Sequence, residues 1–195
     1  RASMAVKNNR RTKLTKMLLK NSLIELMNDK AVNHITIKEL CEKADLNRST
    51  FYLHYTDQYQ LLSEIENDLL EDTIQYLQNV TTDCGTTLYI TAFLKYVKNN
   101  SSIFRILLCR QENTDFQTAF IEKIMGHLKE TLPSVYSAEI EKYIYGFVIH
   151  GCLQIIRDWI LSGYDLPEQT IADIIYQLCH KSYSEFSAEQ HPDCL

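Results

Sequence analysis

Helix-breaking residues are scarce in this chain, which has only 5 glycines and 3 prolines among its 195 residues. The remainder is rich in Leu, Ile, Lys, Glu and Gln, which favour long helices. Apolar residues make up 45% of the chain, enough for a substantial core. No stretch of useful length alternates apolar and polar residues as a half-buried strand would. The sequence therefore predicts an all-α fold.

Apolar residues also recur with the period of a helix. Near the end of the chain, Ile171, Ile174, Ile175 and Leu178 fall at i, i+3, i+4 and i+7. The same reasoning predicts helices over residues 12–30, 58–80, 86–98, 102–109, 115–132 and 137–161, a helix from Thr36, a short helix from Asn47, and a last helix opened by Leu166-Pro167.

Two of these helices are separated by a tight turn. Thr36 and Glu39 form the pattern of a capping box, in which each side chain satisfies a free amide of the first helical turn. Asp45 lies where the chain must turn, and aspartate tolerates left-handed backbone dihedrals better than most residues. Asn47 is a favoured N-cap for the following helix. This pattern is typical of a helix-turn-helix.

The short helix after Asn47 has two different faces. Phe51 and Tyr55 are four residues apart and lie on the face predicted to pack inward. The opposite face carries one cation, one hydroxyl, one phenol and one aliphatic side chain, from Arg48, Ser49, Tyr52 and Leu53. Such a face suits the DNA major groove, where Arg can bond guanine and an aliphatic group can touch a thymine methyl.

Charge is divided unevenly along the chain. Residues 1–60 hold 11 basic and 6 acidic residues, a net charge of +5, whereas residues 61–195 hold 9 and 19, a net charge of −10. A basic head on an acidic body suggests that the head meets a polyanion. A basic segment that is merely solvated accounts for the charge equally well.

The stretch ITIKELCEKADLNRSTFYLHYTDQYQLL resembles the DNA-binding signature of TetR-family (tetracycline-repressor-like) transcriptional regulators, and the resemblance extends over residues 12–62. It implies that Arg48, Ser49 and Leu53 read bases, while Tyr52 and His54 position the protein on the DNA backbone. The complete set of DNA contacts implied by the resemblance is Thr36, Lys38, Asn47, Arg48, Ser49, Thr50, Tyr52, Leu53 and His54.

Three positions depart from the family pattern. The family usually has Gly where Asp45 stands, Ala where Cys41 stands, and Lys where Gln58 stands at the start of the next helix. That Lys commonly meets a phosphate beside a helix N-terminus. With Gln58 in its place, we expect DNA binding that is somewhat weaker and less sensitive to salt.

The resemblance also implies a two-domain organisation, with a DNA-binding domain over residues 1–57 and a larger ligand-binding and dimerisation domain over 58–195. The final two helices would form a homodimer, which places two reading helices about one DNA turn apart and selects a palindromic operator. The stretch WILSGYDLPEQTIADII is similar to the end of a regulatory domain found in many of these proteins. Repression by blocking promoter access is the family default.

A pocket for a small, partly apolar effector is predicted between the middle helices. Aromatic side chains would line it and two polar residues, His150 and Gln154, would anchor the ligand. The aromatic candidates are Tyr89, Phe93, Tyr96, Phe104, Phe116, Phe120, Tyr143 and Phe147. An aromatic residue at helical spacing belongs to a core more often than to a pocket, so a plain core is the competing interpretation.

Other functional classes find less support. The chain has no GxGxxG, P-loop or GxSxG motif, so we expect no enzyme and no cofactor. No apolar run approaches the roughly 20 residues of a membrane span, and no signal-peptide pattern opens the chain, so we expect a cytoplasmic protein. The alternative is a helical protein-interaction module that has lost DNA binding, which only Gln58 favours.

The six cysteines are widely spaced and form no CxxC pair. We expect them to be reduced and mostly buried rather than joined in a disulfide framework. A zinc site is poorly supported because the only close Cys/His pairs are Cys179-His180 and His191 with Cys194. Redox sensing through Cys84 or Cys109 is equally weak, because the only nearby basic residue is Arg110 beside Cys109.

Overall fold

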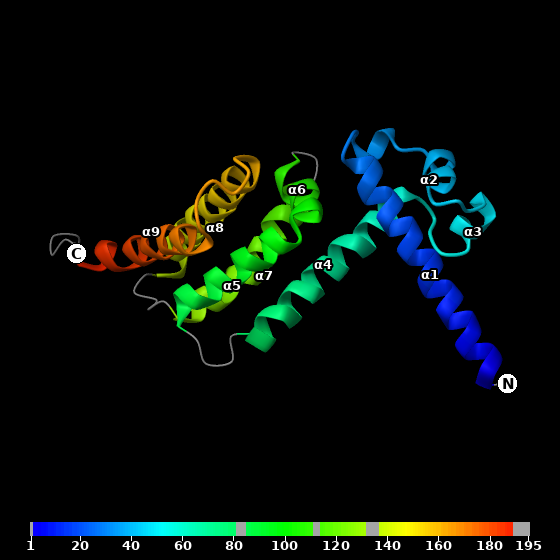
Figure 1. Cartoon of the computed structure of the whole chain (residues 1–195). Coiled ribbons are helices and arrows are strands. Elements are labelled where there is room, and N and C mark those ends of the chain that lie inside the picture. The colour runs from blue at the N-terminus through cyan, green and yellow to red at the C-terminus, as the bar shows by residue number, and fades with distance from the viewer. Residues whose placement is uncertain (1, 81–84, 111–113, 132–136, 189–195) are drawn as a thin grey trace. The chain divides into compact units, whose positions relative to one another are not determined.

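The computed structural model describes residues 2–80, 85–110, 114–131 and 137–188. The predicted all-α fold is confirmed, since these residues form helices and no strand (Figure 1). The helices are α1 (Ala2–Met27), the 3-10 helix η1 (Val32–His34), α2 (Ile37–Lys43), α3 (Arg48–Tyr52), α4 (Gln58–Val80), α5 (Thr86–Asn99), α6 (Ser101–Cys109), α7 (Thr114–Thr131), α8 (Ala138–Leu161) and α9 (Glu168–Ala188).

The chain divides into two compact units, residues 1–69 and 70–195. The first unit thus takes in the first half of α4, whereas the sequence predicted a domain boundary at residues 57 and 58, just before α4 begins. Functional domains of 1–57 and 58–195 stay a prediction. Part of the expected break at 81–87 lies outside the described residues.

In the first unit, α1 supplies the stripe on which α2 packs (Figure 1). Leu19, Leu23 and Met27 of the predicted stripe are buried, while Leu26 is half-buried. α1 begins at Ala2, ten residues before the predicted start at Thr12, and ends at Met27. The spacing of apolar residues located the buried part of α1, because that spacing reflects packing; the basic segment before it has no such pattern.

The turn between α2 and α3 has the geometry expected from the sequence. The Thr36 hydroxyl accepts a hydrogen bond from the Glu39 N–H at 3.2 Å, as an N-cap should. Asp45 has a left-handed φ of 52°. The N–H of Leu46 donates to the carbonyl of Cys41 at 2.9 Å, which closes the end of α2 as a Schellman motif.

One part of that expectation was wrong, and one was incomplete. Asn47 occupies the N-cap position of α3 with extended dihedrals, but its side chain makes no capping hydrogen bond. The Glu39 carboxylate pairs with Lys30 at 2.5 Å, and the pKa of Glu39 is lowered by Lys30 first and also by the backbone amide of Thr36. The capping box is therefore present, and Lys30 is a further partner that a local sequence pattern cannot reveal.

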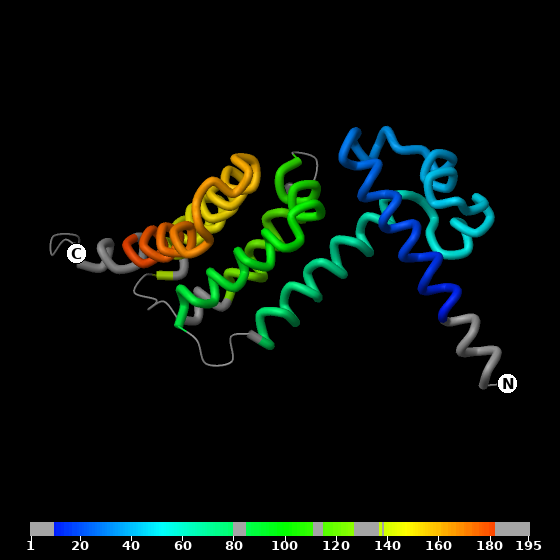
Figure 2. Tube along the Cα trace, viewed as in Figure 1, coloured from blue at the N-terminus to red at the C-terminus, as the bar shows by residue number. Residues whose placement is uncertain are grey.

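In the second unit, α8 and α9 lie side by side, as Figure 2 shows. Trp159 of α8 is buried, and its indole N–H donates to the carbonyl of Leu166, in the connection before α9, at 2.8 Å. The Tyr164 ring meets Trp159 edge-on with centroids 4.8 Å apart. Gly163 and Tyr164 both take positive φ values, so this aromatic contact is built on a tight turn that returns the chain onto α8.

Among the described helices, α8 alone, over Glu139–Leu161, is long and apolar enough to cross a membrane. This is weak evidence for a membrane span, because a core helix of a soluble protein passes the same test. Only a third of that window is buried in the chain. α8 therefore exposes apolar side chains that no described part of this chain covers.

The left-handed dihedral at Asp45 predicts the sign of two substitutions. Asp45→Gly should raise the free energy of unfolding and Asp45→Ala should lower it, with about 1–2 kcal/mol between the variants, because only glycine escapes the Cβ clash. Urea unfolding followed by circular dichroism measures both. As a control, Glu42→Gly in the helical part of α2 should destabilise by about 1 kcal/mol. Equal stabilities for the Gly and Ala variants at residue 45 would contradict this account.

Candidate nucleic-acid interface

The two faces of α3 are those predicted from the sequence. Phe51 and Tyr55 are buried. Tyr52 and Leu53 are 58% and 79% exposed, large fractions for side chains of this size. The remaining candidates on this segment are exposed at Asn47, Arg48 and Ser49 and half-buried at Thr50 and His54. The structure therefore brings the residues of α3 together on one accessible surface.

This surface is supported from beneath by aromatic packing. The Phe51 ring meets Tyr52 edge-on at 5.5 Å between centroids and Tyr55 at 5.7 Å. The Lys16 ammonium of α1 lies 5.3 Å from the centroid of the Tyr55 ring, within cation–π range. Burial raises the pKa of the Tyr55 hydroxyl, and the nearby charge of Glu64 raises it further. Tyr55 thus stays neutral and ties the end of the α3 segment to α1.

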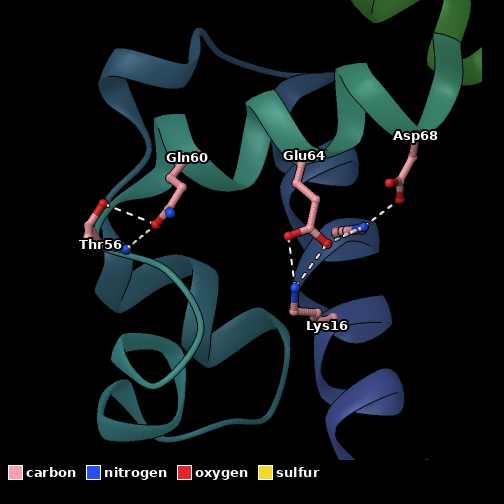
Figure 3. Close-up of polar contacts among 6 residues, drawn as sticks. Lys16, Thr56, Gln60, Glu64 and Asp68 are labelled. Atoms are coloured by element: carbon pink, nitrogen blue, oxygen red, sulfur yellow. Dashed lines mark hydrogen bonds and ion pairs between the residues drawn. The ribbon is translucent and has the colours of Figure 1, made fainter. Parts of the chain in front are cut away.

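An ion-pair cluster joins α1 to the first half of α4 (Figure 3). The Glu64 carboxylate lies 2.9 Å from the Lys16 ammonium and 2.7 Å from that of Lys20, and Lys20 also meets Asp68 at 2.5 Å. Burial disfavours the charge on Lys20, but the hydrogen bonds and charges of Asp68 and Glu64 outweigh it and raise the pKa. Likewise, burial opposes ionisation of Glu64, but both lysines overcome it and lower the pKa.

The start of α4 is capped by residues that the sequence analysis did not select. The Asp57 carboxylate accepts the N–H of Gln60 at 2.8 Å. Figure 3 shows the neighbouring contact, in which the Gln60 side-chain oxygen accepts the N–H of Thr56 at 2.7 Å. The signal was available, because Asp followed three residues later by Gln is a capping-box pattern. Gln58, which stands where the family has Lys, is half-buried in the first turn of this capped helix.

The predicted contacts at the start of α2 are accessible as well. Thr36 and Lys38 are both exposed, and Lys38 lies 3.7 Å from Glu42 on the next turn. Such an exposed pair is weak and can exchange for a phosphate. Lys43 is paired with Glu25 at 2.8 Å. Arg48 makes no ion pair with any described residue, so its guanidinium is the more available cation.

Five of the aromatic effector candidates, from α5, α6 and α7, contact one another in the second unit. Phe93, Phe104 and Phe120 are fully buried and contact one another with ring centroids 5.8–6.4 Å apart. The Tyr96 ring meets Phe104 edge-on with ring centroids 5.9 Å apart, and the centroids of Phe116 and Phe120 are 5.6 Å apart. These five rings are packed against each other as an aromatic core. Mutual contact therefore favours the core interpretation for them, and ligand binding by them stays a prediction.

The other candidates lie elsewhere. The Tyr89 hydroxyl donates to the carbonyl of Ile124 at 3.0 Å. Tyr143 and Phe147 are 72% and 73% exposed on α8. His150 and Gln154, the proposed polar anchors, are exposed on the same helix, where their polar atoms meet Gly146 at 2.8 Å and Asp158 at 2.7 Å. Periodicity placed all four α8 residues on a helix but could not show which face was covered.

Two features of the second unit were missed. Gln117 is 1% exposed beside the aromatic core; its amide nitrogen donates to the carbonyl of Leu107 at 3.0 Å, and its amide oxygen has no hydrogen-bond partner among the described residues. In addition, a pocket of about 80 Å³ lies between α8 and α9, with walls that include Phe147, Cys152, Leu178 and Cys179 and that expose only apolar surface. A single glutamine or cysteine in a helix gives no sequence signal for either.

Cys41, Cys152 and Cys179 are buried and Cys109 is half-buried, as free thiols. The other two, Cys84 and Cys194, lie outside the described residues. Within the described ranges, no group of three or more His, Cys, Asp or Glu side chains could hold a metal ion. The possible zinc pair of His191 with Cys194 also falls outside those ranges.

Comparison with known proteins now identifies this arrangement. Residues 86–181 match the family model for a transcriptional regulator C-terminal region of the TetR type. A Bacillus subtilis protein named as the HTH-type transcriptional regulator YxbF is 28% identical over 169 residues. The chain belongs to the TetR family of transcriptional regulators. The aligned part is 82% of this chain but 43% of YxbF, so this TetR-family chain spans less than half of that relative's length.

Other relatives cover the chain more evenly. An HTH-type transcriptional regulator from Haemophilus influenzae is 21% identical, over 85% of this chain and 87% of its own length. The crystal structure of a TetR regulator from Streptococcus agalactiae aligns with a TM-score of 0.73 at 21% identity, covering 90% of this chain and 98% of that one. This structural likeness confirms the fold of a helix-turn-helix unit followed by a larger helical unit.

The ion-pair cluster predicts a pH-dependent loss of stability. Glu64→Gln should lower the free energy of unfolding by about 1–2 kcal/mol at neutral pH, because Lys16 loses its carboxylate partner and Lys20 keeps only Asp68. The folded-state pKa of Glu64 is lowered, so this stabilisation is complete above the unfolded pKa of about 4.3 and disappears as the pH falls through the folded pKa.

Chemical denaturation of wild type and variant between pH 3 and 8 measures that difference. Glu25→Gln is the matched control, because Glu25 also pairs with a lysine but is well exposed. It should change stability by less than about 0.5 kcal/mol. A Glu64→Gln effect that stays constant down to pH 3 would rule out the electrostatic origin.

Proposed function

We propose that this TetR-family regulator binds a palindromic operator as a homodimer in the cytoplasm, represses transcription by blocking the promoter, and responds to a small-molecule effector. The observation that carries DNA binding is the α3 segment, whose Tyr52 and Leu53 project outward while Phe51 and Tyr55 anchor it. Two large neighbouring side chains exposed together on the outer face of a short helix are typical of a surface that a partner covers. A major groove, about 12 Å wide, accepts such a helix.

The candidate DNA-contacting side chains of the α3 segment, residues 47–54, divide into two roles. Arg48, Ser49 and Leu53 read base edges, since they offer cationic and hydroxyl donors and an aliphatic contact for a thymine methyl. Tyr52 and His54 bond the DNA backbone and set the register of the helix. Supporting contacts come from the start of α2, at Thr36 and Lys38, and from Asn47 at the N-cap of α3 and Thr50 within α3. Asn47 suits this role because its amide makes no capping bond.

Fluorescence-anisotropy titration tests DNA recognition directly. The protein is titrated against DNA from its own upstream region and against a random duplex at several salt concentrations. We expect an operator complex at least about a thousandfold tighter than the random complex, with affinity falling steeply as salt rises. Weak and equal binding to both duplexes, persisting against a selected random-sequence library, would favour the helical interaction module instead.

Two variants in the same titration separate base reading from phosphate contact. Arg48→Ala should lose about 1–3 kcal/mol of operator binding and should relax discrimination at one base pair. Tyr52→Phe should weaken operator and random DNA by similar factors, because it removes a backbone contact. Arg105→Ala, which removes an exposed cation of α6, is the control and should leave both affinities unchanged. A uniform loss in Arg48→Ala would assign that residue to phosphates.

Dimerisation is supported by the uncovered apolar surface of α8 and α9. Tyr143 and Phe147 of α8 lie one turn apart, and Ile174 and Leu178 of α9 do likewise. All four are exposed in the single chain. Apolar side chains spaced at helical intervals on two adjacent helices form the kind of patch that a second copy covers, and a closed pair uses the same patch on both subunits.

Sedimentation velocity tests this surface. Phe147→Asp should convert the dimer into a monomer at micromolar concentration and weaken operator binding at least about tenfold, because a palindrome then engages two separate heads. Leu88→Asp introduces the same charge at a comparably exposed apolar residue of α5 and serves as the control. A dimer that survives Phe147→Asp unchanged would place the interface elsewhere.

The effector proposal is supported by Gln117, whose buried amide oxygen has no partner among the described residues. A ligand donor inserted near the aromatic core would satisfy that oxygen, and an unpaired buried polar atom costs about 1–3 kcal/mol. The ligand would regulate only through unequal affinity for the DNA-bound and free states. A compound that binds there should release the protein from the operator when it is added to the anisotropy titration.

A further inference from the structure

Two cysteines distant in sequence meet between the last two helices. The sulfur of Cys152 on α8 lies 3.7 Å from that of Cys179 on α9, and both residues are 3% exposed. The helices are consecutive and packed against each other, so the pair is held by the fold rather than by a flexible segment. Of the four cysteines that the structure describes, only these two are close to another thiol.

The thiols are buried but not sealed. Both line the pocket of about 80 Å³ between α8 and α9, together with Phe147, Gly151, Ile155 and Leu178. The pocket presents no polar surface. It therefore admits a small uncharged reagent. A bulky thiol reagent would not fit, and a charged one would lose favourable hydration on entering the pocket.

The pair has an internal division of roles. The hydrogen bond between the two thiols, in which either sulfur can donate, lowers the pKa of the Cys179 thiol against the opposing effect of burial. The same hydrogen bond, reinforced by burial, raises the pKa of Cys152. Sulfurs 3.7 Å apart let either thiol resolve the other once it is oxidised, and the lowered pKa favours Cys179 as the first to react, since the thiolate is the attacking form.

We propose that Cys152 and Cys179 form a thiol redox site that a small hydroperoxide, such as hydrogen peroxide, converts into an intrachain disulfide between α8 and α9. The Cys179 sulfur attacks one peroxide oxygen, the O–O bond breaks, and the departing hydroxide takes a proton to become water. The resulting sulfenic acid is attacked by the Cys152 sulfur, which loses its proton as a second water departs. Two thiols are oxidised and both peroxide oxygens are reduced.

The lone cysteines show why this site is selective. Burial raises the pKa of Cys41 in the first unit and of Cys109 in the second, and neither has a thiol partner among the residues that the structure describes. Each lacks both the stabilised thiolate and the resolving thiol that the pair provides. Moderate peroxide should therefore oxidise the pair first and leave these two cysteines reduced.

The proposed disulfide also lies beneath the proposed dimer surface. Phe147 and Leu178 line the pocket above the thiols and are themselves exposed on that surface. A bond between α8 and α9 would fix the relative position of these two side chains and so alter the fit of a second copy. This regulatory consequence rests on the proposed dimer, whereas formation of the disulfide does not.

The experiment treats the reduced full chain with equimolar hydrogen peroxide, alkylates the remaining thiols, and maps peptides by mass spectrometry without reduction. We expect a cross-linked peptide pair joining Cys152 to Cys179 in most molecules, with Cys41 and Cys109 alkylated. Recovery of Cys152 and Cys179 as alkylated thiols after unfolding, or their linkage to other cysteines instead, would overturn the proposal. Because the readout is a covalent bond, it is independent of DNA binding.

Variants and a second oxidant sharpen the assignment. Cys152→Ala should leave Cys179 as a sulfenic acid that dimedone traps, whereas Cys179→Ala should trap at least about tenfold less label at Cys152. Cys41→Ala is the control and should form the Cys152–Cys179 bond as wild type does. Oxidised glutathione, which is charged and too large for the pocket, should form the bond at least about tenfold more slowly than peroxide. Equal rates of disulfide formation with peroxide and with oxidised glutathione would overturn access through the pocket. If a variant fails to fold, the peptide map of the wild-type protein still tests whether Cys152 and Cys179 form the disulfide.

Discussion

The burial of Phe51 and Tyr55 is the contact on which the recognition surface depends. A helix of five residues, Arg48–Tyr52, is too short to be stable by its own hydrogen bonds. Its orientation comes instead from these two aromatic side chains, which are packed beneath it. The exposure of Tyr52 and Leu53 is a consequence, because fixing one face of so short a helix fixes the other. One face of this segment therefore stabilises the unit, and the opposite face is the one proposed to contact DNA.

Charge strengthens the same unit in a way that apolar packing cannot. Glu64 meets two lysines of α1, and the shifted pKa values of Glu64 and Lys20 show that both charged forms are favoured in the folded protein. A carboxylate shared between two ammonium groups is directional, so it specifies how α1 and the first half of α4 are aligned as well as holding them together. Lys16 contributes twice, through Glu64 and through the face of the Tyr55 ring.

The second unit separates two kinds of apolar surface. Its interior holds tightly packed aromatic rings around Phe104, with Gln117 as an incompletely satisfied polar group. On its outer surface, Phe147 of α8 and Leu178 of α9 are exposed, and both line the pocket that the paired thiols of Cys152 and Cys179 also line. Under the two proposals above, the interior would provide stability and a polar ligand contact, whereas the outer surface would provide the dimer contact and the oxidisable thiols. Assembly and redox state would then be coupled through one pair of helices.

The sequence by itself determined the helices, the turn at Asp45 and the two faces of α3, because helical periodicity, caps and turns depend on residues only a few positions apart. The identity of the DNA-contacting residues rests on the family resemblance and stays a prediction. Only the tertiary structure decided that Glu64 meets Lys16 and Lys20, and that the effector candidates of α5–α7 form a core while those of α8 are exposed. It likewise decided the Cys152–Cys179 contact, since residues 27 positions apart meet only when their helices pack.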